Sequence, residues 1–165
     1  VSRPTEGTTT YPASYTEGSV TTSTSFTLVV AAISPKFTIE DITASVNGTV
    51  EVTVKASGFT TEVAAIDLRL YADSTYLKYN STEFTGVALG GLKIAKTDEK
   101  NASNVVLANI PSSPIILDGA IIKIKFTAIK TGSTKINMIS TELLDSNGLK
   151  LAGTDISDTA TVTIK

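Results

Sequence analysis

The chain has 165 residues, of which 41% are hydrophobic and 18% are charged, with a net charge of −2. This composition suits one globular domain with a sizeable core, and the dispersed lysines and arginines exclude the basic footprint of a nucleic-acid-binding protein. Histidine and cysteine are absent, which excludes histidine general bases, Ser-His-Asp triads, thiolate metal sites and cysteine nucleophiles.

Residues 1–24, VSRPTEGTTTYPASYTEGSVTTST, are rich in Thr, Ser, Gly and Pro and have almost no aliphatic side chains. Such a segment cannot offset the entropy of ordering, so we predict a linker here and a domain at residues 25–165. The longest apolar run, FTLVVAAI at Phe26 to Ile33, is too short to span a membrane as a helix. Residues 26–32 of this run are a possible tenth strand.

From Ser25 onward the pattern indicates β-structure throughout. Period-two alternation recurs, as in Val50, Val52 and Val54 against polar neighbours, and turn signals such as Asn-Gly separate the runs. This spacing predicts an all-β, antiparallel β-sandwich. We expect nine strands, at residues 37–43, 49–57, 64–71, 76–80, 92–96, 104–109, 120–128, 134–140 and 159–164.

The strand at residues 64–71 carries two charges within an apolar run. Ile66 and Leu68 point to one face, whereas Ala65, Asp67 and Arg69 point to the other. The first face is core. The second meets either water or a protein partner.

The strand in NVVLAN is apolar on both faces. Val105 and Leu107 share one face, and Val106 and Ala108 share the other. Either the strand is central and covered by a loop, or Val106 and Ala108 belong to an exposed apolar patch of the kind that marks protein interfaces.

Other polar clusters have simpler explanations than chemistry. The DSNG stretch at Asp145 lacks the further ligands of a calcium loop, so we interpret it as a hairpin turn. The acid pairs Glu40 with Asp41 and Asp155 with Asp158 are interpreted as solvated faces rather than glycosidase carboxylates. We therefore predict no catalytic residue and no metal ligand.

Three sequons, NGT at Asn47, NST at Asn80 and NAS at Asn101, lie between or at the ends of the predicted strands. We expect them in exposed positions, as candidate N-glycosylation sites of an extracellular or cell-surface protein.

The order of motifs resembles the cohesin modules of scaffoldins and related surface proteins. NGTVEVTV at Asn47 to Val54 is similar to an early strand of that family. AAIDLRLYADSTYLKY at Ala64 to Tyr79 is similar to the pattern GAFDFTLTYDPSVLEV, and matches it at Asp67 and Asp73. Later segments that resemble the family are DGAIIKIKFTAIKTGSTKI, ELLDSNGLKL and TATVTI.

This resemblance implies a nine-stranded jelly-roll sandwich that binds a dockerin module, with the calcium on the dockerin and no cofactor on this chain. It implies a binding face on one sheet, made by the strand of Asp67, the NVVLAN strand, the strand before that and the strand after TGS. Carried over by position, it places Asp67, Val106 and Asn109 on this face, with Ala65, Arg69 and Ala108 as neighbours. Ala65 stands where the family often has Asn, and Asn109 where it often has an acid.

The leading hypothesis is thus a non-catalytic, dockerin-binding module that assembles an extracellular or cell-surface complex. A carbohydrate-binding module of similar shape is one alternative, and a structural domain of a surface or adhesin protein is another.

Overall fold

The computed structural model describes residues 7–30, 34–86, 90–151 and 157–165. The chain divides into two compact units, Val1–Ile33 and Ser34–Lys165. Among the described residues, none forms a helix with the length and hydrophobicity that crossing a membrane requires.

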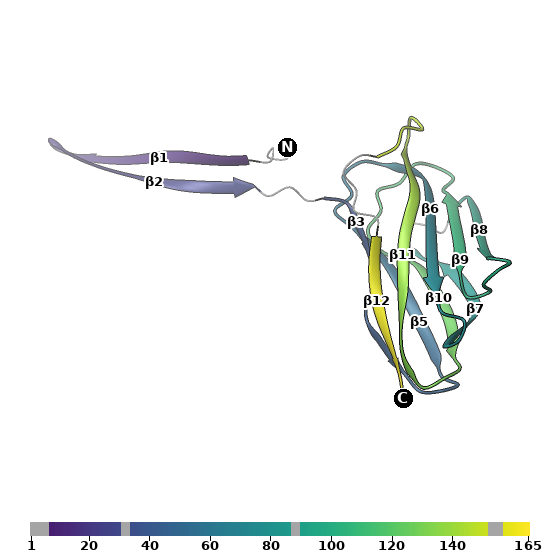
Figure 1. Cartoon of the computed structure of the whole chain (residues 1–165). Helices are drawn as coiled ribbons and strands as arrows, with labels where there is room; N and C mark the ends of the chain where they lie inside the picture. Colours follow the sequence, from purple (N-terminus) through teal and green to yellow (C-terminus); the bar gives the residue numbers. More distant parts are fainter. Residues whose placement is uncertain (1–6, 31–33, 87–89, 152–156) are drawn as a thin grey trace. The chain divides into compact units, whose positions relative to one another are not determined.

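The first unit is a two-stranded antiparallel hairpin of β1 (Gly7–Glu17) and β2 (Val20–Val30) (Figure 1). A turn at Gly18 and Ser19 joins the strands, and the φ of +60° at Gly18 suits its glycine. Composition predicts a linker over residues 1–24, yet the described part of that segment is largely paired backbone. Residues 1–6 of this linker, and residues 31–32 of the possible strand after it, lie outside the described residues.

The second unit is a sandwich of two sheets. One sheet has the order β3 (Lys36–Thr38), β5 (Thr49–Ser57), β10 (Gly119–Ala128), β7 (Leu77–Phe84). The other has the order β4 (Ile42–Ala44), β12 (Ser157–Ile164), β11 (Gly132–Asp145), β6 (Val63–Ala72), β9 (Val105–Ile110), β8 (Leu92–Thr97). The all-β sandwich is therefore confirmed, with antiparallel ladders except for the parallel β4–β12 pair.

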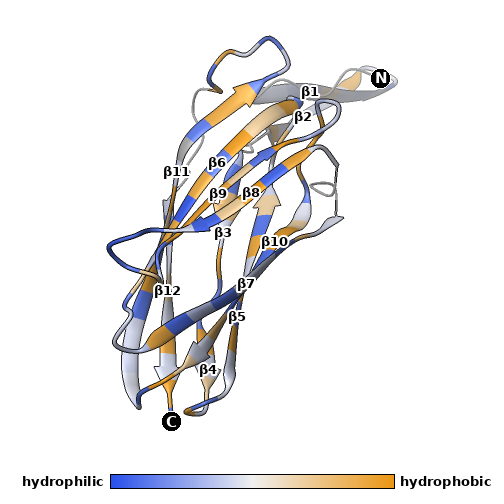
Figure 2. Cartoon of the chain, turned by 90° about the vertical axis from the view of Figure 1, so that its right-hand side faces the viewer, coloured by the Kyte–Doolittle hydropathy of each residue, from blue (hydrophilic) through white to orange (hydrophobic). Residues whose placement is uncertain are grey.

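The core lies between the inner faces of the two sheets. Val50, Val52 and Val54 of β5 are fully buried, as are Leu68 and Leu70 of β6. Their neighbours along each strand are polar or only half-buried, and Figure 2 shows this as alternating colours along the strands. Full burial of each such side chain contributes about 1.5–3 kcal/mol, so this alternation fixes which face of each strand remains available to a partner.

The strand predicted at residues 37–43 is divided between the two sheets. β3 pairs with β5 in the first sheet, whereas β4 pairs with β12 in the second. Two carboxylates stabilise the segment at residues 39–41, where the chain crosses from one sheet to the other. Asp158 Oδ2 accepts a hydrogen bond from the Ile39 amide at 2.8 Å, and Asp41 Oδ1 accepts one from the Thr161 amide at 2.7 Å.

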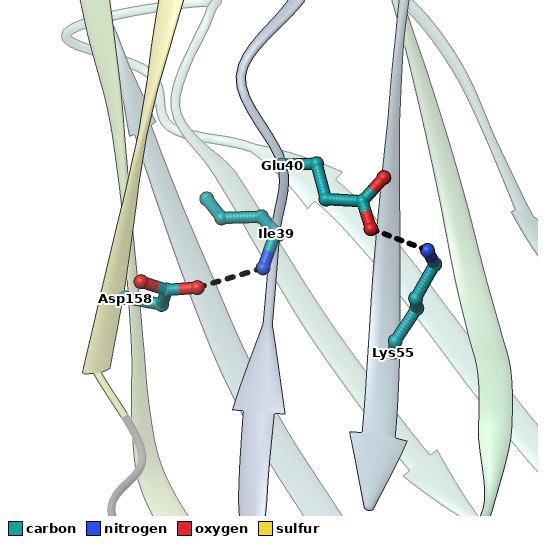
Figure 3. A network of polar contacts seen from close by, with 4 residues as sticks. All are labelled: Ile39, Glu40, Lys55 and Asp158. Carbon is teal, nitrogen blue, oxygen red and sulfur yellow. Dashed lines mark hydrogen bonds and ion pairs between the residues drawn. The ribbon is translucent and has the colours of Figure 1, made fainter.

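Glu40 lies beside the same crossing and forms an exposed ion pair with Lys55 at 2.6 Å (Figure 3). Of the acids interpreted as solvated, Asp41 and Asp158 instead receive backbone hydrogen bonds and have a structural role. Asp155 lies outside the described residues.

Candidate binding face

The four strands of the expected binding face, β11, β6, β9 and β8, are neighbours in that order within the six-stranded sheet (Figure 2). Cross-strand partners share a face of a sheet, so the register defines which side chains lie together away from the core. We call this side the outer face. Its residues are Asn137, Ile139, Glu142 and Leu144 on β11, Ala65, Asp67, Arg69 and Tyr71 on β6, Val106, Ala108 and Ile110 on β9, and Leu92, Ile94 and Lys96 on β8.

Asp67 and Arg69 occupy the centre of the outer face. Arg69 Nε lies 3.9 Å from Asp67 Oδ1, and the two side chains are 44% and 31% exposed respectively. Glu142 of β11 pairs directly across from Asp67. The centre of the outer face therefore presents two neighbouring carboxylates, which can accept hydrogen bonds from a partner.

Apolar side chains surround this charged centre. Val106 pairs across from Arg69, and Ala108 from Asp67, and both are half-buried on the outer side of a central strand. The cross-strand neighbours Leu92 and Ile110 extend this apolar surface and are 56% and 50% exposed. Continuing the alternation from Val106 and Ala108 by two residues would have identified Ile110 from the sequence.

Asn109 does not lie on the outer face. Strand alternation places it with Val105 and Leu107 on the inner side, where it is 1% exposed. Its Nδ2 donates hydrogen bonds to the backbone oxygens of Gly90 at 3.3 Å and Leu92 at 3.2 Å. The residue therefore fastens the start of β8 to β9, and the position carried over from the resemblance is wrong for this side chain.

The three sequons differ in their environments. Asn47 is exposed in a turn with a φ of +64°, and Asn80 is exposed on β7. Asn101 is half-buried, and its side chain donates to the Ala72 carbonyl at 3.1 Å and accepts from the Ser103 amide at 3.0 Å. Asn47 and Asn80 are thus exposed residues, although the Asn80 side-chain amide lies 2.8 Å from Thr127 Oγ1, and the half-buried Asn101 amide is bonded to backbone groups.

The DSNG stretch forms a turn in which the aspartate accepts backbone hydrogen bonds. Asp145 Oδ1 accepts hydrogen bonds from the amides of Asn147 at 2.8 Å and Leu149 at 2.9 Å. These hydrogen bonds lower the pKa of the Asp145 carboxyl below its usual value, and the bond from the Leu149 amide has the largest effect. Over the described part of the chain, no three His, Cys, Asp or Glu residues gather as metal ligands would.

Comparison with known proteins places this fold. The cohesin domain family matches residues 35–164. A type I cohesin–dockerin complex from Clostridium thermocellum containing the OlpA cohesin superposes with a TM-score of 0.69 at 15% identity, covering 80% of this chain and 99% of that one. A non-cellulosomal cohesin from the archaeon Archaeoglobus fulgidus gives 0.67 at 18% identity, covering 80% and 91%.

The CaCohA2 cohesin of Clostridium acetobutylicum gives a TM-score of 0.68 at 15% identity, covering 80% of this chain and 91% of that one. A comparison with curated protein sequences finds no match. At such identities the superpositions show a shared fold, and the family match spans nearly the whole second unit. The chain belongs to the cohesin family.

Proposed function

We propose that the second unit is a non-catalytic module that binds a calcium-loaded dockerin through its outer face. Cohesins are binding modules rather than enzymes, and a cohesin of similar fold is seen in complex with a dockerin. In this proposal the calcium belongs to the dockerin, and the module itself needs no cofactor.

The observation that carries the proposal is the outer face itself. It offers the Asp67–Arg69 pair at the centre of a sheet, with the apolar Val106 and Ala108 of β9 directly beside it. An interface centre of this kind combines hydrogen bonds with water exclusion, since Val106 and Ala108 flank the charges. Strands also hold side chains more rigidly than loops do, which lowers the entropic cost of binding.

The opposite sheet is less suited to a partner. Its exposed side carries Glu51 between Lys123 and Lys125, at 3.1 and 3.6 Å, which is a row of solvated charges in which one carboxylate is shared by two lysines. A flat charged surface of this kind gives little affinity because its pairs are already satisfied and screened.

Carbohydrate binding has weaker support. Among the residues that define the outer face, Tyr71 is the one aromatic side chain, and it is 37% exposed. Sugar platforms depend on broad aromatic surfaces, and nothing else on this face supplies one.

We further propose that the protein acts outside the cell or at its surface, in the assembly of a multi-protein complex. The accessible sequons at Asn47 and Asn80 suit such a location, if the host glycosylates them.

Isothermal titration of the chain with calcium-loaded dockerin modules tests the function. We expect saturable binding to at least one dockerin of the source proteome, abolished when a chelator removes the dockerin's calcium. Retardation of the chain in polysaccharide gels, with no response to any dockerin in calcium, would favour the carbohydrate alternative. No response to either ligand class would favour a structural domain.

A further inference from the structure

The hairpin of β1 and β2 is a structure that does not stabilise itself. Every side chain described in it is exposed, and among the described residues its strands pair only with each other. A two-stranded hairpin is marginal in water, and independent stability takes three or more strands with an apolar face. This two-stranded ribbon, β1 and β2, therefore needs further strands or a covering surface to be stable.

The two faces of the ribbon differ in character. Tyr11 and Phe26 are stacked, with ring centroids 5.2 Å apart, and the pairing register places Tyr15 and Leu28 on the same face. The other face carries hydroxyl pairs, including Thr10 with Thr27 at 3.3 Å and Thr16 with Thr21 at 2.9 Å. One face thus gathers the aromatic rings and Leu28, and the other gathers hydroxyl pairs together with Val29.

Charge does not oppose self-association of this ribbon. From Gly7 to Val30 the sequence holds a single charged residue, Glu17, next to the turn. Natural edge strands commonly carry lysines or other charges that prevent pairing with another edge. Over its length β2, VTTSTSFTLVV, has neither a charge nor a proline.

The two edges of the ribbon are not equivalent, because of Pro12. In a two-residue hairpin the pair beside the turn, here Glu17 and Val20, exchanges both hydrogen bonds, and bonded and non-bonded pairs then alternate. Counting outward, Pro12 and Ser25 form a non-bonded pair, so the Pro12 nitrogen faces away from β2. The outer edge of β1 thus lacks one donor, whereas the outer edge of β2 keeps all of its donors.

We propose that the free edge of β2 pairs with β2 of a second copy of this chain, antiparallel and about a two-fold axis. The pairing gives a four-stranded sheet, β1-β2 continued by β2-β1 of the second copy, which meets the strand number that stability requires. A second copy fits because the edge is self-complementary: it is intact, uncharged, and the same on both chains. The aromatic faces of both ribbons then lie on one side of a single sheet.

The area of this contact determines how strongly the two copies should bind each other. Tyr11, Tyr15 and Phe26 are 43%, 68% and 60% exposed. These side chains lie on one face of the four-stranded sheet, and Tyr11 and Tyr15 belong to β1, so pairing at the β2 edge buries little of their area. The edge of a single strand falls well below the roughly 800 Å² per partner of a standard stable interface, so the dimer is weak and depends on protein concentration.

Two proline substitutions at directly opposite residues test the edge assignment. Ser14 and Ser23 are cross-strand partners in a non-bonded pair, so a proline at either position leaves the β1–β2 hydrogen bonds in place. Ser23→Pro removes a donor from the free edge of β2, whereas Ser14→Pro removes one from the β1 edge that already carries Pro12. The readout is sedimentation velocity of the full chain from micromolar to millimolar concentration.

We expect a concentration-dependent dimer for the wild type and for Ser14→Pro, and a dissociation constant raised at least about tenfold for Ser23→Pro, or about 1.4 kcal/mol. Phe26→Ser, which keeps every backbone donor, should weaken the dimer while leaving it detectable. A wild type that stays monomeric at millimolar concentration, or equal effects of the two prolines, would overturn the proposal. An unchanged melting curve of the sandwich in each variant confirms that the substitutions act on the hairpin alone, since hairpin and sandwich belong to different compact units.

Discussion

Replacing Asp67 with alanine tests the proposed binding face most directly. Its carboxylate lies at the centre of the outer face, 3.9 Å from Arg69 and across the strands from Glu142 and Ala108. A partner that covers this position removes the water around the carboxylate and supplies hydrogen-bond donors in its place. Truncation then leaves those donors unpaired in a desolvated site.

The magnitude follows from this central position. Hot-spot side chains near the middle of an interface typically cost about 2 kcal/mol or more on truncation, which is about thirtyfold in affinity. The free module should lose little stability. The half-exposed Asp67–Arg69 pair contributes about 0–1 kcal/mol, and the like charge of Glu142 directly opposite costs about 0.2–1 kcal/mol. These effects offset each other, so the melting temperature should move by less than about 2 °C.

A carboxylate on the other sheet supplies the matched control. Glu51 of β5 is 37% exposed and lies 3.1 Å from Lys123, so it resembles Asp67 in exposure and in having a cationic neighbour. Calorimetric titration of calcium-loaded dockerin into wild type, Asp67→Ala and Glu51→Ala should show a strong loss for the first variant only. Equal affinities for all three proteins would refute the outer face as the binding surface, even if the module binds dockerin elsewhere.

Three further outcomes follow from the same geometry. Val106→Ala should weaken dockerin binding by about fivefold, since it removes two methyl groups from the apolar surround but no hydrogen bond. Asn109→Asp should destabilise the sandwich by about 3 kcal/mol at neutral pH in urea titrations, because it buries a charge beside two carbonyl oxygens. Burial raises the folded-state pKa of the new carboxyl, so this loss should shrink as the pH falls through that raised value and should be smallest below the unfolded value of about 4. Asp145 has a lowered folded-state pKa, so its support of the turn is present above the usual aspartate value and is lost as the pH falls through the folded one. The protection of the Asn147 and Leu149 amides against hydrogen exchange, relative to the intrinsic exchange rate at each pH, should therefore fall in acid, and Asp145→Ala should remove that change.

Period-two alternation predicts most of the sandwich from sequence, because a residue's side of the sheet decides its burial. The strand expected at residues 49–57 coincides with β5, and 120–128 differs from β10 by a single residue. The single strand predicted at residues 37–43 is wrong, because alternation does not show to which sheet a residue belongs. The chain changes sheets at residues 39–41, where Asp158 and Asp41 accept backbone hydrogen bonds. β7 extends to Phe84 through Ser81, Thr82 and Glu83, polar residues that a sheet-edge strand tolerates and an apolar pattern misses.

The candidate site is predictable where alternation and resemblance agree, and fails where they conflict. Asp67 and Val106 satisfy both criteria. Asn109 satisfies the resemblance alone, whereas its spacing from Leu107 already indicates the inner side. Pairing register was not accessible from one sequence, so the opposition of Glu142 to Asp67, across a register shift after Ser140, emerges only from the structure. Backbone pairing within the Thr-rich segment was missed for a related reason, since low aliphatic content indicates a missing core but does not forbid a hairpin.

The outer face and the β2 edge belong to different units and share no strand, so their binding events should be thermodynamically independent for a monovalent partner. Ser23→Pro should therefore leave the affinity for a single dockerin unchanged, and Asp67→Ala should leave the self-association constant unchanged. In the double variant the two losses should add within about 0.5 kcal/mol. A two-dockerin partner behaves differently, because a dimer presents two outer faces and converts the second binding event into an intramolecular one. Its apparent affinity should then rise with dimerisation in the wild type and fall to the single-dockerin value in Ser23→Pro. If a two-dockerin partner binds the wild type and Ser23→Pro with equal affinity, the hairpin does not bring two modules together, whatever the outcome for Asp67.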